Sequence, residues 1–379
     1  MSNGPSEQTA VESESCHAPG MISGTLHVYV AFDWGDEVDL ERARILLPGE
    51  ARDLPRRRRT PSSVGYRPVP LRFQLAPITL EIPQTGSLKA PAEAIVFDFA
   101  AVSLAMHAPI RLPGESLSQV AAWLADPSPI VQAAREAIQP LHQKLLPAIQ
   151  DPLWQDELSE EYFVFQLPPG EIGSPAELLA SYSGWLAGLV RLENGQLSSE
   201  EVQEALRLNL RYSPDDLFIP DWAAALLVDR ECDETLQTIE FANLQLLEFR
   251  HIDNRLDDSL ATVYKVIHRL AQKRLSLWRS PARSLRVLGE LKVEANGLFE
   301  RTGNALKLVG DQYLARVYRL VSTRFHLEAW EQNIKRKLDV AEGVYRVVSD
   351  QTDTYRAEFL ELTVVFLILF EILLALLRH

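Results

Sequence analysis

The run FLELTVVFLILFEILLALL, at residues 359–377, decides the predicted fold of this chain. Nineteen helical residues rise about 28 Å, close to the roughly 30 Å of a bilayer's hydrocarbon core. Thirteen of the residues from 362 to 377 are Leu, Ile, Val or Phe, and each favours membrane insertion by roughly 0.3–0.6 kcal/mol near the helix centre. Glu371 opposes insertion by about 2.5–3.5 kcal/mol. Because the sum favours insertion, the sequence predicts a transmembrane helix over residues 359–377, with a buried core helix as the alternative.

The N-terminal residues carry none of the usual targeting signals. Residues 1–20 contain no Lys or Arg and include three Glu residues. A secretory signal has a basic start and an apolar run, and a mitochondrial presequence has Arg and few acids. We therefore expect residues 1–21 to be a disordered leader. Together with the terminal helix, this predicts a single-pass protein of the cytoplasmic (inner) membrane, with its head domain in the cytoplasm.

Composition and motifs exclude several classes of function. The formal net charge of −14 argues against indiscriminate nucleic-acid binding, and we expect no specific DNA partner. The two cysteines, Cys16 and Cys232, share no motif spacing, so neither a disulfide framework nor a Cys-based zinc site is expected. The GxxxxGKS/T, GxGxxG, HExxH and GxSxG motifs are absent. The sequence therefore predicts no catalytic, cofactor-binding or metal-ligating residues and no cofactor.

Strand and helix patterns alternate over residues 22–222. Strand patterns, rich in Val, Ile, Tyr and Phe, occur at residues 25–34, 71–82, 94–107 and 161–167. Helical patterns occur at residues 114–125, 129–149 and 175–192. Strands separated by helices predict an α+β head domain. Asp98, flanked by Phe97 and Phe99 in a strand pattern, is the residue on which an enzymatic hypothesis rests.

After the head domain, the apolar residues take the spacing of a coiled coil. Between residues 239 and 270, ten positions alternate spacings of three and four, with Asp253 as the one polar interruption. The dipeptide Ser280-Pro281 breaks this pattern and a second helical run follows, so residues 223–358 predict a long helical hairpin or coiled-coil stalk. From residue 334 to 376 the same spacing continues into the terminal run. This seam must pack against the hairpin or another copy, and we predict a homo-oligomer.

Five residues of these helices are candidates for interaction or structural roles: Arg250, Asp253, Asp311, Arg316 and Glu371. Arg250 and Asp253 lie three apart and can pair on one helix, and an unpaired Asp253 in the apolar seam would be costly. Asp311 and Arg316 are expected to make interhelix contacts. Glu371 is an acid in an apolar run, and such acids mostly face a protein interior or a polar partner.

A basic run, Arg56, Arg57, Arg58 and Arg59, lies in a segment punctuated by Pro and Gly. Such a run is most often a solvated loop. The functional alternative is an anion contact, with phospholipid head groups, RNA or an acidic face of a partner subunit as the anion.

Several segments resemble one known family. The block LLEFRHID at residues 246–253, followed by Leu256 and Asp257, is similar to the Leu-Leu-Glu-aromatic-Arg-x-x-Asp signature of the Rmd family (required for meiotic nuclear division). The run at residues 97–99 resembles the family's Phe-Asp-Tyr-Gly segment, with Ala100 in place of the glycine. Further similarity lies at residues 310–318, at Trp330 with residues 337–339, and at Glu361 and Glu371.

This resemblance spans about residues 90–379 and implies little about activity. Members of the family are largely of unknown function, and no catalytic residues are established that could be carried over. Eukaryotic members have a C-terminal anchor, several in the mitochondrial inner membrane, where one class supports translation. The acidic leader here fits a prokaryotic member better.

Three hypotheses of function follow from the sequence. The first is a membrane-anchored, oligomeric scaffold that recruits a protein partner. The second is a membrane-tethered factor that supports translation, in which Arg56–Arg59 contact the ribosome or its RNA. The third is an enzyme with a site in the head domain around Asp98.

Overall fold

The structure, a computed structural model, describes residues 18–53, 68–83, 85–154, 158–272 and 312–377, together with residues 289, 292–293, 295–297 and 299. The chain forms two compact units. We call Met1–Leu247 with Ala305–His326 the sheet unit, and Glu248–Asn304 with Leu327–His379 the helical unit. The predicted domain boundaries after residues 21, 222 and 358 stay a prediction.

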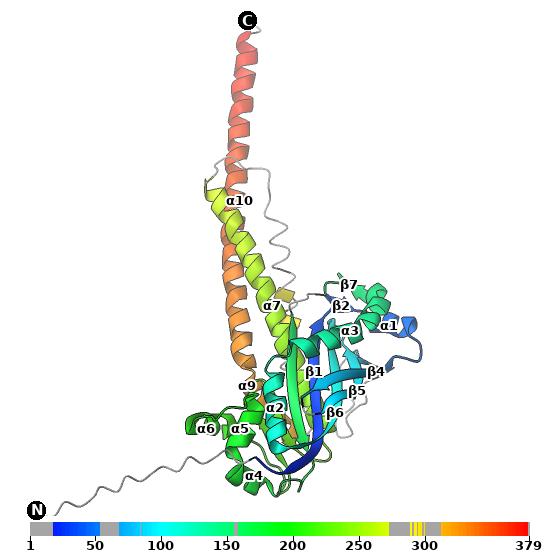
Figure 1. The fold of residues 1–379 in the computed structure, drawn as a ribbon. Coiled ribbons are helices and arrows are strands. Elements are labelled where there is room, and N and C mark those ends of the chain that lie inside the picture. The colour runs from blue at the N-terminus through cyan, green and yellow to red at the C-terminus, as the bar shows by residue number, and fades with distance from the viewer. Residues whose placement is uncertain are drawn as a thin grey trace, which may run out of the picture. The chain divides into compact units, whose positions relative to one another are not determined.

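A mixed sheet of eight strands forms the centre of the sheet unit (Figure 1). Its order is β3-β4-β5-β6-β1-β8-β10-β9, and within it only β8 and β10 pair in parallel. The strands are β1 (Met21–Asp33), β3 (Arg52–Asp53), β4 (Leu71–Ile82), β5 (Gly86–Val96), β6 (Ala101–Pro113), β8 (Ser159–Leu167), β9 (Leu217–Pro220) and β10 (Ala224–Val228). A second, two-stranded sheet pairs β2 (Glu37–Val38) with β7 (Ile149–Gln150).

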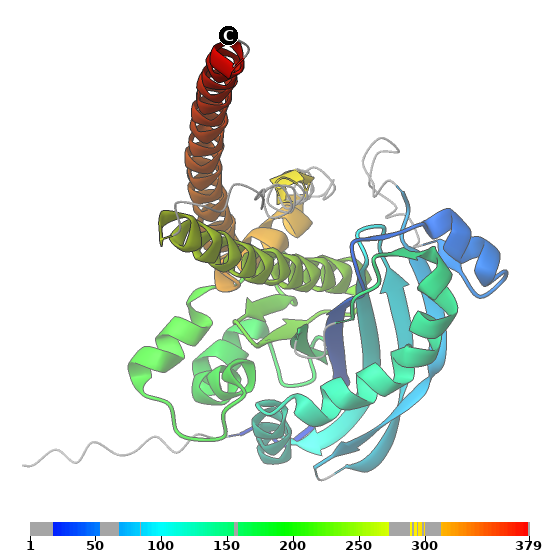
Figure 2. The ribbon, with the colours of Figure 1, turned by 90° about the horizontal axis from the view of Figure 1, so that it is seen from above.

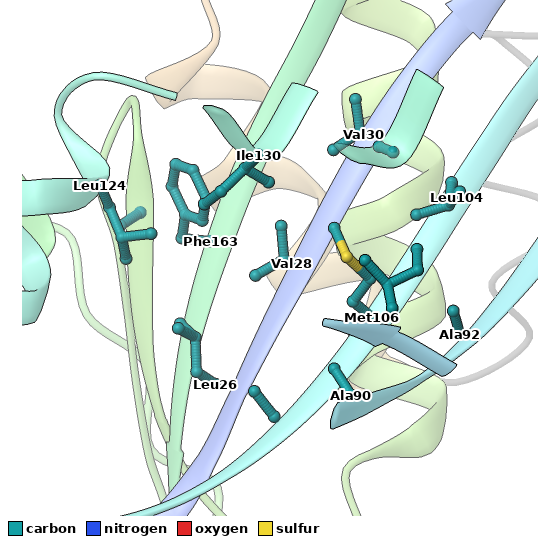
Figure 3. Close-up of a cluster of buried hydrophobic side chains, with 14 of the residues drawn as sticks. Leu26, Val28, Val30, Ala90, Ala92, Leu104, Met106, Leu124, Ile130 and Phe163 are labelled. Atoms are coloured by element: carbon teal, nitrogen blue, oxygen red, sulfur yellow. The ribbon is translucent and has the colours of Figure 1, made fainter. Parts of the chain in front are cut away.

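Strand β1 is buried because apolar side chains follow one another along both of its faces. On one face Leu26, Val28 and Val30 lie in the main core, where Figure 3 shows them beside Ala92, Leu104 and Met106 of the neighbouring strands. Helices cover this face, and Figure 2 shows α3 lying across the curved sheet. The helices of the sheet unit before β9 are α1 (Leu40–Leu46), α2 (Gly114–Leu124), α3 (Ser128–Leu145), η1 (Leu146–Ala148), α4 (Pro175–Ser181), α5 (Ser183–Arg191) and α6 (Ser199–Arg207).

The opposite face of β1 carries His27, Tyr29 and Ala31. The first turns of α7 (Asp233–Gln272) pack on this face, where Leu244 and Leu247 join Ala31 in a smaller apolar cluster. Two polar side chains of β1, His27 and Tyr29, therefore lie buried in the protein instead of in water.

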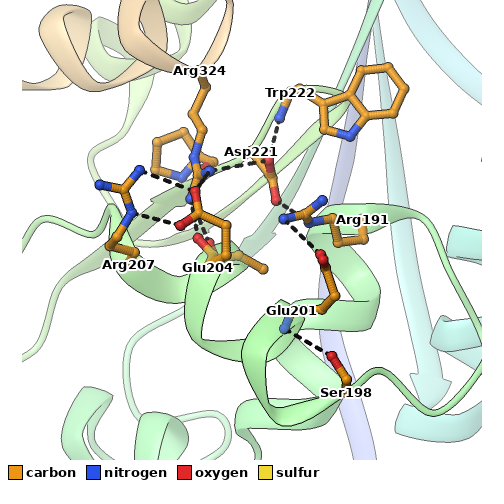
Figure 4. Close-up of polar contacts among 10 residues, drawn as sticks. Arg191, Ser198, Glu201, Glu204, Arg207, Asp221, Trp222 and Arg324 are labelled. Carbon is orange, nitrogen blue, oxygen red and sulfur yellow. Dashed lines mark hydrogen bonds and ion pairs between the residues drawn. The ribbon is translucent and has the colours of Figure 1, made fainter.

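A buried arginine ties α9 (Gln312–Arg324) to the rest of the sheet unit (Figure 4). The Arg324 guanidinium donates to the backbone carbonyls of Glu204, at 2.6 Å, and Ala205, at 3.1 Å, which lie in the last turn of α6. These carbonyls have no partner within the helix, so Arg324 caps α6. Arg324 also donates to Pro220 O at 3.2 Å and pairs with Asp221, a carboxylate that is only 2% exposed.

In the helical unit, the part of α7 from Glu248 onward and α10 (Leu327–Leu377) share a partly buried ion-pair cluster. Lys337 Nζ lies 2.7 Å from Asp253 Oδ1 and 2.6 Å from Asp257 Oδ1, and Asn333 Nδ2 donates to Asp253 at 3.1 Å. The one polar position of the predicted seam is therefore satisfied from α10.

The structure contradicts the predicted fold class, an α+β head domain with a helical stalk and one C-terminal transmembrane helix. It shows a mixed α/β fold around an eight-stranded sheet, and over the ranges described no helix combines the length and the apolarity that crossing a membrane requires. Glu361 and Glu371 limit the uncharged stretch in α10 to residues 362–370, which rise only about 14 Å. The predictions of a tail-anchored, single-pass protein of the inner membrane are therefore wrong.

Two segments of secondary structure also differ from the predictions. Residues 94–107 form two strands, β5 and β6, joined by a turn in which Ala100 has a φ of 61°. Residues 224–228, predicted as the start of a long helix, form β10. Residues 1–17 of the predicted leader and the predicted break at 280–281 lie outside the described ranges.

Replacing Arg324 tests whether this side chain holds α9 in place. Arg324→Met leaves the carbonyls of α6 and Pro220 without this donor, while Asp221 keeps Arg191 at 2.8 Å, and we expect a loss of about 2–3 kcal/mol in the free energy of unfolding. Arg207→Met is the matched control, since Arg207 pairs with the same Glu204 from an exposed position and should change stability by no more than about 0.5 kcal/mol. Urea denaturation measures both, and equal losses would contradict the assignment.

Candidate functional site

A polar pocket of about 200 Å³ lies between the sheet and the first turns of α7, entirely within the sheet unit. Three neighbouring strands form the floor of the pocket, where Tyr29 of β1 and Glu93 of β5 both lie opposite Ala105 of β6. From α7, Asp233, Leu236, Gln237 and Glu240 line the pocket, and their spacing of three, four and seven puts them on one helix face. Arg72 of β4 and His107 of β6 complete its polar lining.

The basic group of the pocket is already paired. Arg72 Nε donates to Glu93 Oε2 at 2.7 Å, and Arg72 Nη2 contacts the same oxygen. The Glu93 side chain is 15% exposed and the Arg72 side chain 39% exposed. The guanidinium charge is therefore balanced at the floor of the pocket.

Two histidines meet beside the pocket. His27 Nδ1 lies 2.8 Å from His107 Nδ1, and His27 Nε2 lies 2.8 Å from Gln166 Oε1. Because Gln166 Nε2 donates to the carbonyl of Asp229, its Oε1 is the acceptor, and His27 Nε2 carries the proton. It follows that His27 Nδ1 accepts a hydrogen bond from His107 Nδ1–H, which places the lone pair of His107 on Nε2.

Burial keeps these rings and the nearby phenol neutral. Burial lowers the pKa of His27 to about 4, and it also lowers the pKa of His107, with the charge of Arg72 adding to the effect. Burial raises the pKa of Tyr29 well above its ordinary value. At neutral pH none of the three side chains carries a charge.

Glu240 is the unusual group of the pocket. Its side chain is buried, with 6% exposure, and among the described residues no donor makes a hydrogen bond to Oε1. Burial raises the pKa of Glu240 from 4.5 to about 7, and the charge of Glu93 adds to this rise. The nearby hydroxyl of Ser103 lowers the pKa of Glu240, although the two side chains do not have the geometry of a hydrogen bond. The carboxyl group of Glu240 therefore titrates near neutral pH.

None of the residues predicted from the sequence as site residues lies in this pocket. Arg250 is half-buried on α7, and burial lowers its pKa. Asp253 has Lys337 of α10 as a basic partner, and Arg316 is exposed on α9. Glu371 lies on α10. Asp311 and the basic run Arg56, Arg57, Arg58 and Arg59 lie outside the described residues.

Asp98 lines a separate pocket of about 390 Å³ with Glu37, Asp39 and Glu41. Its backbone carbonyl accepts from Val38 N at 2.7 Å, which holds the turn between β5 and β6 against β2. A cluster of acids alone points to no ligand, so we assign no site there.

The sequence does not predict the polar pocket, because the residues that line it are far apart in the chain. The signal that was present is weak: His27 and Tyr29 are the polar-tipped residues of an otherwise apolar strand pattern, and they fall on one face of it. Nothing in the sequence links this face to Glu240.

Comparisons with known proteins give a family without an assigned activity. The family model described as "Uncharacterized protein MJ0711, N-terminal domain" matches residues 23–234, more than half of the chain. An uncharacterised protein of Methanocaldococcus jannaschii, MJ0711, is 26% identical over 223 residues, which cover 58% of this chain and 67% of that protein. No solved structure matches.

The raised pKa of Glu240 makes a prediction about stability and pH. Between pH 4.5 and 7 the folded chain binds more protons at Glu240 than the unfolded chain does, so this group makes stability fall as the pH rises. Glu240→Gln removes the effect. From pH 5 to pH 7.5 we expect the stability of the variant to increase by about 2 kcal/mol relative to the wild type.

Urea denaturation of both proteins at the two pH values measures this difference. Glu231→Gln is the matched control, because Glu231 is exposed just before α7 and does not line the pocket. A Glu240→Gln variant whose stability differs from the wild type by the same amount at pH 5 and pH 7.5 would refute the assignment.

Proposed function

The chain belongs to the family of the uncharacterised MJ0711 N-terminal domain, and from its geometry we propose that it is an interaction protein whose sheet unit binds a small polar ligand in the polar pocket. The observation that carries this proposal is Glu240, a residue that lines the pocket and whose buried Oε1 has no hydrogen-bond donor among the described residues. A buried oxygen without a donor is costly. A ligand that supplies the donor offsets this cost.

The ligand-binding proposal is tested by thermal shift with small polar fragments of positive, zero and negative charge. We expect at least one fragment to raise the melting temperature of the full chain, and Glu240→Gln to remove the shift because the fragment contacts that carboxyl. Glu231→Gln should retain it. A shift that survives Glu240→Gln, or no shift with any fragment, would contradict binding in the polar pocket.

The exposed end of α10 favours a second function, self-association. Nine large apolar side chains between residues 362 and 372 are each at least 50% exposed. A helix that is apolar all round is stable in water only when other surfaces cover it. Since every copy carries the same run, with the seam spacing of three and four, we propose that copies of the chain cover one another's α10 and form a homo-oligomeric scaffold.

Mass photometry of the full chain tests self-association. We expect species larger than a monomer, and we expect the double variant Phe366→Glu, Leu369→Glu to shift them to monomer because it places charges in the apolar surface. Gln332→Glu adds a charge to an exposed position of α10 outside that surface and should leave the oligomer intact. A wild-type chain that is monomeric at micromolar concentration would disprove this proposal.

Kinship with the Rmd family, as a prokaryotic member, remains part of the proposal. Its support is the similarity at residues 246–257 and 310–318, both of which lie beyond the matched residues 23–234. A role in translation with Arg56–Arg59 as the ribosome contact stays a prediction, since those residues are outside the described ranges.

A further inference from the structure

The polar pocket presents mainly hydrogen-bond acceptors to a ligand, although its Tyr29 hydroxyl and Gln237 amide can donate as well as accept. Its strong donor, the Arg72 guanidinium, is engaged with Glu93, and His107 Nδ1 donates to His27. The acceptors are the carboxylates of Asp233 and Glu240 and the lone pair on His107 Nε2. A ligand that satisfies this lining must itself carry N–H or O–H donors.

The charges that face the pocket sum to a negative value. Arg72 and Glu93 neutralise each other, and His107, His27 and Tyr29 are neutral at pH 7. Asp233 and, when it is ionised, Glu240 remain. The N-terminal end of a helix attracts anions, but the first turn of α7 already carries Asp233 and Glu234. The pocket therefore repels anionic ligands.

Volume and geometry narrow the class of ligand further. The pocket volume of about 200 Å³ is below the roughly 300–1,000 Å³ of pockets that hold drug-sized ligands, so the pocket suits a small ligand. Within the described part of the chain, no group of three His, Cys, Asp or Glu side chains is arranged to hold a metal ion. A small organic cation fits these limits.

The two carboxylates mark the ends of the site. Asp233 and Glu240 lie on one face of α7, two turns and about 10.5 Å apart along its axis. Asp233 is exposed at the mouth, and Glu240 is buried at the inner end. A ligand with a cationic group at each end can therefore meet both acids.

We infer that the polar pocket binds a small organic cation whose amine or guanidinium N–H groups donate to Glu240 at its inner end and to Asp233 at its mouth. The inference rests on the proposed ligand-binding function and adds the chemical class of the ligand. Binding requires the ionised form of Glu240, so protons compete with the ligand for that carboxylate.

Isothermal titration calorimetry on the full chain tests the inference with four-carbon probes that differ in charge. The cationic probes are 1,4-diaminobutane and agmatine, and the controls are neutral 1,4-butanediol and anionic succinate. At pH 8 we expect both cations to bind saturably and neither control to bind. Because a proton competes at Glu240, whose pKa is about 7, affinity for the cations should fall about tenfold from pH 8 to pH 6.

Two variants localise the binding. Glu240→Gln should weaken the cations at least tenfold at pH 8 and remove the dependence on pH, while Glu231→Gln changes neither. Asp233→Asn, at the exposed mouth, should weaken 1,4-diaminobutane at least threefold, and it keeps the test valid should Glu240→Gln fail to fold. Cation affinity unchanged in Asp233→Asn and in any folded Glu240→Gln would overturn the inference.

The outcomes separate this inference from the proposed function. If 1,4-butanediol or succinate binds more tightly than the cations, and Glu240→Gln abolishes that binding, the pocket is a ligand site but the cation class is wrong. The same holds if all four probes fail while another fragment gives a shift that depends on Glu240. If neither the probes nor any fragment binds, both ideas fail together.

Discussion

The burial of β1 on both faces is the constraint on which the sheet unit depends. Along TLHVYVAFDW, Leu26, Val28 and Val30 go to the helix-covered core, so the residues between them must go to the other face. A slip of one residue would exchange the two faces, and the register with β6 and β8 is therefore strongly specified. This register places the polar groups of His27 and Tyr29 on the face that α7 covers.

Once α7 packs over these polar side chains, each of them needs a partner inside the protein. His27 has two hydrogen-bond partners, His107 and Gln166. The Gln166 amide in turn donates to the carbonyl of Asp229, just before α7. Glu240, which faces them from α7, has a buried oxygen without a hydrogen-bond donor among the described residues. A hydrocarbon side chain there would avoid the cost, so the acid is difficult to explain by packing alone.

The sequence predicted local patterns well and spatial pairs poorly. The strand predicted at 25–34 coincides with β1 over residues 25–33, because alternation and β-branched residues are local signals. The apolar run of β10 fits a helix as well as a strand, because a short apolar segment is compatible with either structure. The turn through Ala100 cannot be predicted, because an alanine in the left-handed region has no local sequence signature. The pairing of Asp253 with Lys337 and the meeting of Tyr29 with Glu240 join residues far apart in the chain. Only the three-dimensional fold brings such pairs together.

The proton affinity of Glu240 couples the pocket to the stability of the fold. At neutral pH the ionised carboxyl is disfavoured by burial, and the folded chain retains a proton that the unfolded chain releases. Any ligand that donates to the ionised form replaces that proton and binds the native state alone, which stabilises the fold by mass action. Ligand, proton and folding are thus linked through one carboxyl group. Buried acids are usually paired, and exceptions to such rules are expected at functional sites. The oxygen of Glu240 that is unpaired among the described residues therefore fits a functional site better than a purely structural role.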